Sequence, residues 1–143
     1  MAKTDIDAMV TFLRSVPPIT SPDFAVKPEA APDSHKDGVI SSALGKRVFE
    51  EACVSCHGWS GESPVTPFAT LTGSGAVSDQ SAMNVAQIVM AGATRLTPDG
   101  ALSMPRFGEA YSNEEIAAVA NFVTARFGVK GSSLTPQDIA KLR

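Results

Sequence analysis

Two cysteines and a histidine occur at a spacing that suits covalent attachment of a porphyrin. Cys53 and Cys56 are separated by two residues, and His57 follows directly. Thiols at this spacing can add across the two vinyl groups of a haem, and the adjacent imidazole is then held under the iron as an axial ligand. The stretch therefore predicts one c-type haem, attached to both cysteines, in a protein that moves single electrons.

Two other uses of paired cysteines stay open at this point. A structural zinc ion needs four ligands. Besides the two thiols, only His57 and His35 remain, and His35 lies in a Pro-rich stretch. A dithiol redox motif is typical of a βαβ pattern, which this sequence does not show.

The haem iron needs a second axial ligand, and Met104 suits this role best. It lies 104 − 57 = 47 residues after His57, which is enough chain to reach the opposite face of the ring. Pro105 favours an extended backbone at Met104 and so helps to project its side chain from a loop. Met90 is the reserve ligand, but with Met83 it forms a stripe that is typical of a packed helix face.

Further contacts around the haem are expected from neighbouring residues. The second ring nitrogen of His57 needs an acceptor, and the carbonyls of Ser63–Val65 are the candidates. Arg95 and the indole N–H of Trp59 are candidate partners of the haem propionates. The alternative interpretations are a solvated arginine and a tryptophan that only packs.

Composition narrows the class of protein. The chain has 143 residues, 43% hydrophobic residues and a net charge of −3, which suits one domain with extensions. The sequence contains no Lys/Arg cluster of the kind that would indicate a nucleic-acid partner. We expect no signal peptide in this chain, because residues 1–20 lack a basic start followed by a continuous apolar run, and no membrane-spanning helix, because no 18-residue apolar span occurs. Because haem attachment takes place in an oxidising, exporting compartment, we expect a periplasmic chain that is a processed or excised piece of a longer exported protein.

Apolar spacing predicts an all-α fold, because no segment alternates convincingly between apolar and polar residues. We expect helices over 4–15, 42–52, 79–91 and 113–127, and a short one from Thr135-Pro136, with loops at 58–77 and 93–111. Ser112 and Glu115 form a predicted capping box. We expect the helix before the cysteines to pack closely against the last long helix. The first carries Gly45 and Phe49 four residues apart, and the second carries Val119 and Phe122 three residues apart.

The first predicted helix resembles the last long one. Ile, Ala and Phe of residues 6–12 recur in residues 116–122, at an offset of 116 − 6 = 110 residues. Two amphipathic helices can share such positions by chance. Alternatively, residues 1–18 are the closing helix of a preceding, similar domain.

Residues 40–130 together resemble a class I c-type cytochrome domain. The opening segment Gly45–His57, the methionine loop Ser103–Phe107 and the closing helix Ser112–Phe122 carry the resemblance. It implies several helices wrapped around one covalently attached haem c. It also implies thioethers at Cys53 and Cys56 and iron ligation by His57 and Met104.

A narrower resemblance is to the last domain of the tri-haem cytochrome subunits of membrane-bound bacterial dehydrogenases. It is carried by residues 67–73, 84–92, 104–107 and the tail 134–143. It implies a relay, not an enzyme, that takes electrons from a dehydrogenase catalytic subunit through other haem domains toward a quinone or respiratory acceptor. This chain departs in having one attachment motif and no membrane anchor. The same motifs permit a free soluble cytochrome c, an oxidase-associated domain or a haem-based ligand sensor.

The sequence is thus expected to divide into four parts. Residues 1–18 form a helix resembling the end of a preceding cytochrome domain, and residues 19–38 are a Pro-rich linker. Residues 39–130 are the cytochrome c domain, and residues 131–143 are a C-terminal extension with a short helix.

Overall fold

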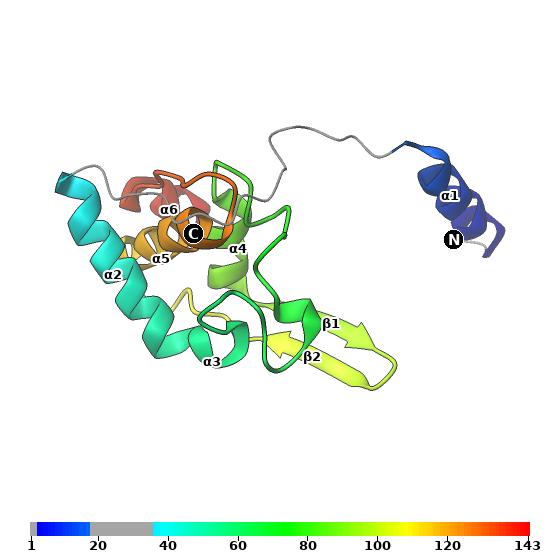
Figure 1. The fold of residues 1–143 in the computed structure, drawn as a ribbon, viewed down its shortest axis with the longest axis horizontal. Coiled ribbons are helices and arrows are strands. Elements are labelled where there is room, and N and C mark those ends of the chain that lie inside the picture. Colours follow the sequence, from blue (N-terminus) through cyan, green and yellow to red (C-terminus); the bar gives the residue numbers. More distant parts are fainter. Residues whose placement is uncertain (1–2, 18–35) are drawn as a thin grey trace.

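The structure is a computed structural model that describes residues 3–17 and 36–143, with side chains in the second range from residue 42 onward. The predicted linker lies largely outside the described residues, as does His35. Figure 1 shows a mostly helical chain, as predicted. Its elements are α1 (Lys3–Ser15), α2 (Lys36–Ala52), α3 (Val54–His57), a 3₁₀ helix (Pro67–Ala69), α4 (Met83–Ala91), β1 (Ala93–Thr97), β2 (Gly100–Met104), α5 (Asn113–Phe127) and α6 (Pro136–Leu142).

Helix α1 begins one residue before its predicted start, and two other helices begin several residues away from theirs. Helix α2 begins at Lys36, before the expected start at residue 42. Helix α4 begins at Met83, after the expected start at residue 79, because the Asp79 carboxylate accepts from the Ser81 amide at 3.0 Å and forms a turn there. The next residue, Ala82, has a left-handed backbone with φ 53°, which separates this turn from the helix. None of the described helices is both long enough and apolar enough to span a bilayer.

The prediction of a loop over 93–111 is wrong for residues 93–104, which form an antiparallel hairpin. Strand β1 pairs with β2 so that Thr97 faces Gly100 and Ala93 faces Met104. Pro98-Asp99 is the two-residue turn between them, and a proline at the first central position with a glycine directly after the turn is a known turn signal. Most side chains of both strands are exposed. The alternation between apolar and polar residues was therefore too weak to predict strands.

The predicted crossing of the two helices is confirmed for α2 and α5. A Cβ added at Gly45 would lie 2.8 Å from the Cβ of Phe122 and would overlap the carbonyl of Ala118. The rings of Phe49 and Phe122 lie 5.5 Å apart, and Phe49 is fully buried. Only glycine permits this approach of the two backbones, so the crossing fixes how closely α2 packs on α5.

Both helix starts expected near the C-terminus are confirmed. The Ser112 hydroxyl accepts from the Glu115 amide at 3.2 Å, and the Glu115 carboxylate accepts from the Ser112 amide at 2.9 Å. The pKa of the Glu115 carboxyl lies below its ordinary value, first because of the Ser112 amide and second because the Ser112 hydroxyl donates to the same carboxylate oxygen at 2.8 Å. Thr135 and Asp138 repeat the same capping box in front of α6.

Helix α6 packs against α5, so residues 131–143 fold back on the domain. The side chain of Ile139 is fully buried in the core cluster. Asn121 of α5 donates to the Leu134 carbonyl at 2.9 Å and accepts from the Leu134 amide at 2.8 Å. The extension is therefore attached by apolar and polar contacts together.

The helix crossing gives a direct test. We expect Gly45→Ala to lower the free energy of unfolding by about 1–3 kcal/mol, because the added methyl group overlaps the α5 backbone. Denaturant titration of the haem-loaded protein measures this. Gly75→Ala is the matched control, since a Cβ there would have no atom within 4 Å, and it should change stability by less than about 0.5 kcal/mol. Equal effects of the two substitutions would contradict the assignment.

Candidate haem-binding site

The attachment residues lie on one helical turn, residues 53–57, which we call the attachment turn: Cys53 lies between α2 and α3, and Cys56 and His57 lie on α3. The amide of Cys53 donates to the Phe49 carbonyl at 3.0 Å and so continues the hydrogen bonding of α2. The carbonyl of Cys53 accepts from the amides of Cys56 and His57 at 3.2 and 3.0 Å. A single helical turn therefore carries both thiols and the imidazole.

The two thiols have different surroundings. Both cysteines are free; Cys53 is partly buried, and Cys56 is exposed. Burial raises the pKa of the Cys53 thiol to about 11, and the charge of neighbouring Cys56 adds to this shift. Cys53 packs against the apolar core beside Val54.

The acceptor for His57 is the carbonyl of Ala69, and the prediction of Ser63–Val65 is wrong. The Nδ1 atom of His57 lies 2.6 Å from the Ala69 oxygen. Because a carbonyl only accepts, Nδ1 carries the proton and Nε2 keeps its lone pair. Ala69 ends the 3₁₀ helix. The sequence contains a signal for this helix, because Thr66 caps it and Pro67 is its first residue.

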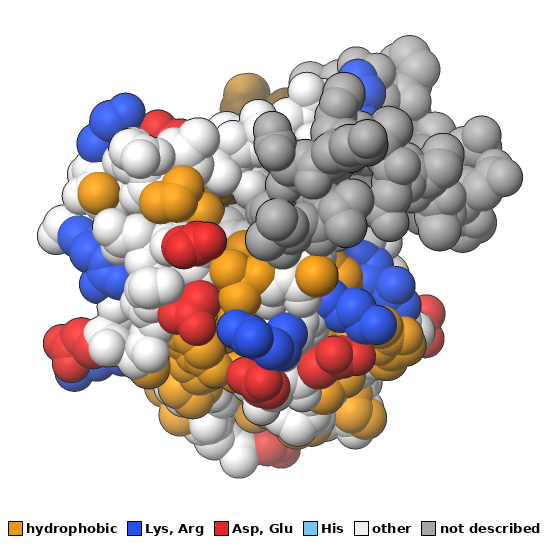
Figure 2. Space-filling model, turned by 90° about the vertical axis from the view of Figure 1, so that its left-hand side faces the viewer, with side chains coloured by type: hydrophobic (Ala, Val, Ile, Leu, Met, Phe, Trp, Pro, Cys, Tyr) orange, Lys and Arg blue, Asp and Glu red, His pale blue; other side chains and the backbone are white. Residues whose placement is uncertain are grey.

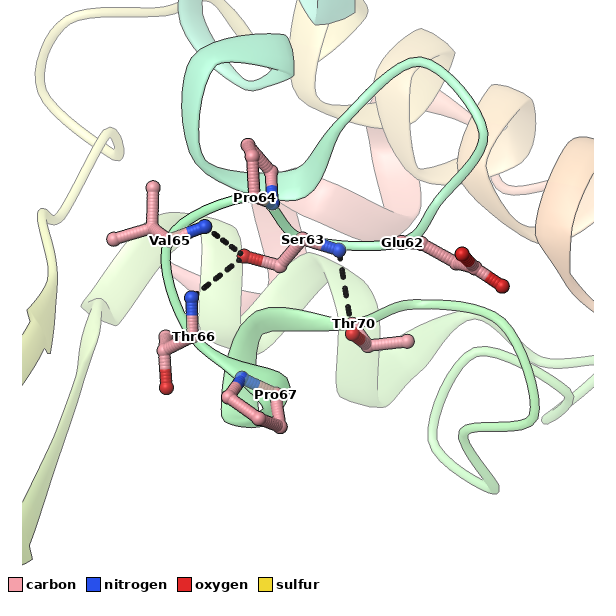
Figure 3. A pocket seen from close by; sticks show the side chains of 7 residues that line it. All are labelled: Glu62, Ser63, Pro64, Val65, Thr66, Pro67 and Thr70. Carbon is pink, nitrogen blue, oxygen red and sulfur yellow. Dashed lines mark hydrogen bonds between the residues drawn. The ribbon is translucent and has the colours of Figure 1, made fainter.

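The loop that presents this carbonyl is held by one serine hydroxyl. Figure 3 shows Ser63 Oγ accepting from the amides of Val65 and Thr66, each at 3.2 Å. The Ser63 amide donates to the Thr70 hydroxyl at 3.3 Å, and Ser63 Oγ donates to the Cys56 carbonyl. The loop is thereby tied to the attachment turn, which keeps the acceptor carbonyl under the imidazole.

Met104 is the last residue of β2 and is partly buried against the core cluster. The hairpin places it opposite Ala93, directly after the end of α4. Gly92 ends α4 with φ 71°, and a Cβ there would lie 2.7 Å from the Met104 carbonyl oxygen. The backbone at Met104 is thus packed closely against the end of this helix.

The residues after Met104 are hydrogen-bonded to α4. The Phe107 amide donates to the Val89 carbonyl at 2.9 Å, and the Gly108 amide donates to the Met90 carbonyl at 3.2 Å. Carbonyls in the last turn of a helix have no partner within it, so this loop supplies one. The reserve ligand Met90 is packed against the core, while its carbonyl anchors the methionine loop.

Arg95 and Trp59 take part in aromatic contacts at the surface. The Arg95 guanidinium carbon lies 4.2 Å from the centroid of the Phe68 ring. The centroid of the Trp59 ring lies 6.1 Å from that of Phe49 and 4.3 Å from the Arg126 guanidinium carbon. Arg126 also donates to the Trp59 carbonyl at 3.1 Å, a contact that the sequence did not predict. Pairing of Arg95 or Trp59 with a haem propionate stays a prediction.

The side chains present fit a covalently attached haem. The donor set is two thiols on one turn, an imidazole whose Nε2 is free to bind iron, and a thioether from a fixed loop. Cys53 and Met104 both pack against the same apolar cluster, which suits a flat apolar ring. Among the described residues, no three His, Cys, Asp or Glu side chains gather as a metal site would require.

Comparisons with known proteins agree with this geometry. The chain is 26% identical to the alcohol dehydrogenase (quinone) cytochrome c subunit of Gluconacetobacter polyoxogenes, over 97% of this chain and 31% of that protein. It is 24% identical to the fructose dehydrogenase cytochrome subunit of Gluconobacter japonicus, over 97% and 32%. It is 30% identical to the gluconate 2-dehydrogenase cytochrome c subunit of Pantoea cypripedii, over 71% and 24%.

The chain spans a third or less of the length of these relatives. Residues 42–126 match the family model for cytochrome c, which is more than half of the chain. That segment contains both cysteines, His57 and Met104, and the family implies a covalently bound haem c. The chain therefore belongs to the cytochrome c family.

Proposed function

We propose that this chain transfers single electrons through one haem c whose iron is held by His57 and Met104. The observation that carries the proposal is the contact of His57 Nδ1 with the Ala69 carbonyl, because it leaves Nε2 as the only ligand nitrogen of that ring. When bound, the haem supplies the one-electron chemistry, and His/Met ligation raises its reduction potential. With both axial positions filled, the domain acts as a relay and not as an enzyme.

The described residues support such a haem in separate ways. The Ala69 carbonyl orients the His57 ring and makes it a stronger ligand. The apolar cluster shared by α2, α4 and α5 excludes water from the ring. The backbone packing around Gly92 holds the Met104 backbone in place, so that its thioether can bind the iron.

The partner that we propose is a dehydrogenase catalytic subunit. The domain would accept electrons from it, directly or through other haem domains, and pass them toward a quinone or respiratory acceptor in the periplasm. Support comes from the names of three relatives, all cytochrome subunits of dehydrogenases. On the face drawn in Figure 2, Lys and Arg side chains are interspersed with Asp and Glu, so this face shows no large area of a single sign for a highly charged partner.

We also propose that α1 is the closing helix of a preceding cytochrome domain. Its apolar face corresponds to positions of α5 that are buried in this domain: Ile116, Val119, Ala120 and Val123. In α1 the corresponding residues are exposed by 40% or more: Ile6, Met9, Val10 and Leu13. Figure 1 draws α1 apart from the other helices. An opening helix like α2 from another domain would bury this face.

The ligand assignment is tested by Met104→Leu, which keeps the side-chain volume and removes the sulfur. We expect the far-red sulfur-to-iron absorption band to vanish and the reduction potential to fall. Carbon monoxide should bind the reduced protein with roughly tenfold or higher affinity, because no thioether competes for the iron. Spectra, potentiometry and gas titration measure these changes.

Met90→Leu is the matched control, since it removes a thioether from a packed helix position, and the band should remain. Loss of the band in Met90→Leu but not in Met104→Leu would overturn the assignment. Tight carbon monoxide binding by the wild-type protein would favour a haem-based ligand sensor in its place.

Removal of residues 1–16 tests the assignment of α1. No residue of α1 is buried, so we expect the free energy of unfolding to change by less than about 0.5 kcal/mol. Ile139→Ala is the contrasting variant: its side chain is fully buried, and its loss should cost about 2–4 kcal/mol. Denaturant titration compares the two. A loss above about 2 kcal/mol on truncation would show that α1 docks on this domain.

A further inference from the structure

The C-terminal strap, which we define as residues 131–143, lies outside the segment that matches the family model. It is nevertheless fastened to α5 at several points. Ile139 is buried, and Asn121 exchanges two hydrogen bonds with Leu134. The Thr124 and Ser132 hydroxyls lie 2.7 Å apart. The end of α6 is therefore held in a fixed place relative to the domain.

Arg143 follows α6 and makes three hydrogen bonds across the surface. Its Nη1 donates to the Gly108 carbonyl, and its Nη2 donates to the Tyr111 carbonyl at 2.9 Å. Its Nε donates to the Asn113 side-chain oxygen at 2.6 Å. The planar guanidinium presents its donors in a rigid fork. One side chain therefore binds three separate acceptors, which the compact ammonium group of a lysine could not reach together.

Two of these three acceptors belong to the segment between Met104 and α5. The same segment is bound on its other side to α4, through the amides of Phe107 and Gly108. The rings of Phe107 and Tyr111 lie 6.0 Å apart and pack within it. Gly108 is thus held from both sides, by α4 through its amide and by Arg143 through its carbonyl.

We propose that Arg143 is a positioning residue for the sixth iron ligand, acting through the segment that follows Met104. The inference rests on the proposed ligation by His57 and Met104. Movement of the chain that carries a thioether allows the thioether to leave the iron. Contacts that lower the population of an opened segment therefore lower the fraction of protein with a free coordination position.

The test uses the haem-loaded protein in four forms: wild type, Arg143→Ala, Arg143→Lys and Lys141→Ala. Lys141 lies on α6, two residues before Arg143, and binds only Asp138 among the contacts described, so its loss is the matched control. Amide hydrogen exchange at Phe107 and Gly108 reports opening of the segment. The far-red band and carbon monoxide binding to the reduced protein report release of the thioether.

In Arg143→Ala we expect exchange at both amides to rise about tenfold, as the loss of charge-assisted hydrogen bonds predicts. Carbon monoxide affinity should rise several-fold and the far-red band should weaken. Arg143→Lys should lie between this variant and the wild type, because an ammonium group can still bind one carbonyl. Lys141→Ala should match the wild type in all three measurements.

Faster exchange with an unchanged band and unchanged carbon monoxide affinity would overturn the inference, because Arg143 would then only stabilise the surface. Unchanged exchange in Arg143→Ala would overturn it as well. A wild-type protein without the far-red band would contradict ligation by Met104 itself, and the inference would fall with it. If the wild type shows the band and only the Arg143 variants show the expected changes, the result supports the role of Arg143.

Discussion

The site depends first on how closely α2 can approach α5. The absence of a side chain at Gly45 lets the α2 backbone lie against Ala118 and Phe122, and Phe49 one turn later fills the crossing. The attachment turn begins directly after this contact, so the crossing also sets the position of Cys53. A helix pair held apart by one methyl group would carry the cysteines away from the cluster against which Met104 packs.

The two proposed iron ligands are positioned by different physical means. His57 lies on a helical turn, and its ring is oriented by one short contact to a carbonyl from a loop. Met104 comes from a strand end and depends on backbone packing against α4, with amide hydrogen bonds on one side and the Arg143 guanidinium on the other. A nitrogen ligand needs its ring orientation set, whereas a flexible thioether needs its backbone held.

Local signals predicted the parts of the structure that depend on neighbours in sequence. The capping box at Ser112 and the helices followed from short-range rules of spacing and hydrogen bonding. The α2–α5 crossing is a long-range contact, but a glycine and an aromatic residue four apart on one helix indicated it. The Ala69 carbonyl and the Arg143 contacts did not follow from such rules, because an acceptor 12 residues away or a donor 32 residues away leaves no periodic trace. The hairpin failed for another reason: its strands are exposed, so no apolar face marks them.

Helices α1 and α5 show why a pattern alone does not determine burial. Ile, Ala and Phe recur at the same spacing in both, and both form helices. The stripe of α5 is buried because α2, α4 and α6 pack around it, whereas the same stripe in α1 meets no comparable partner within the described residues. An apolar stripe specifies that a helix needs a neighbour. Which neighbour it has is decided by the rest of the chain or by another domain.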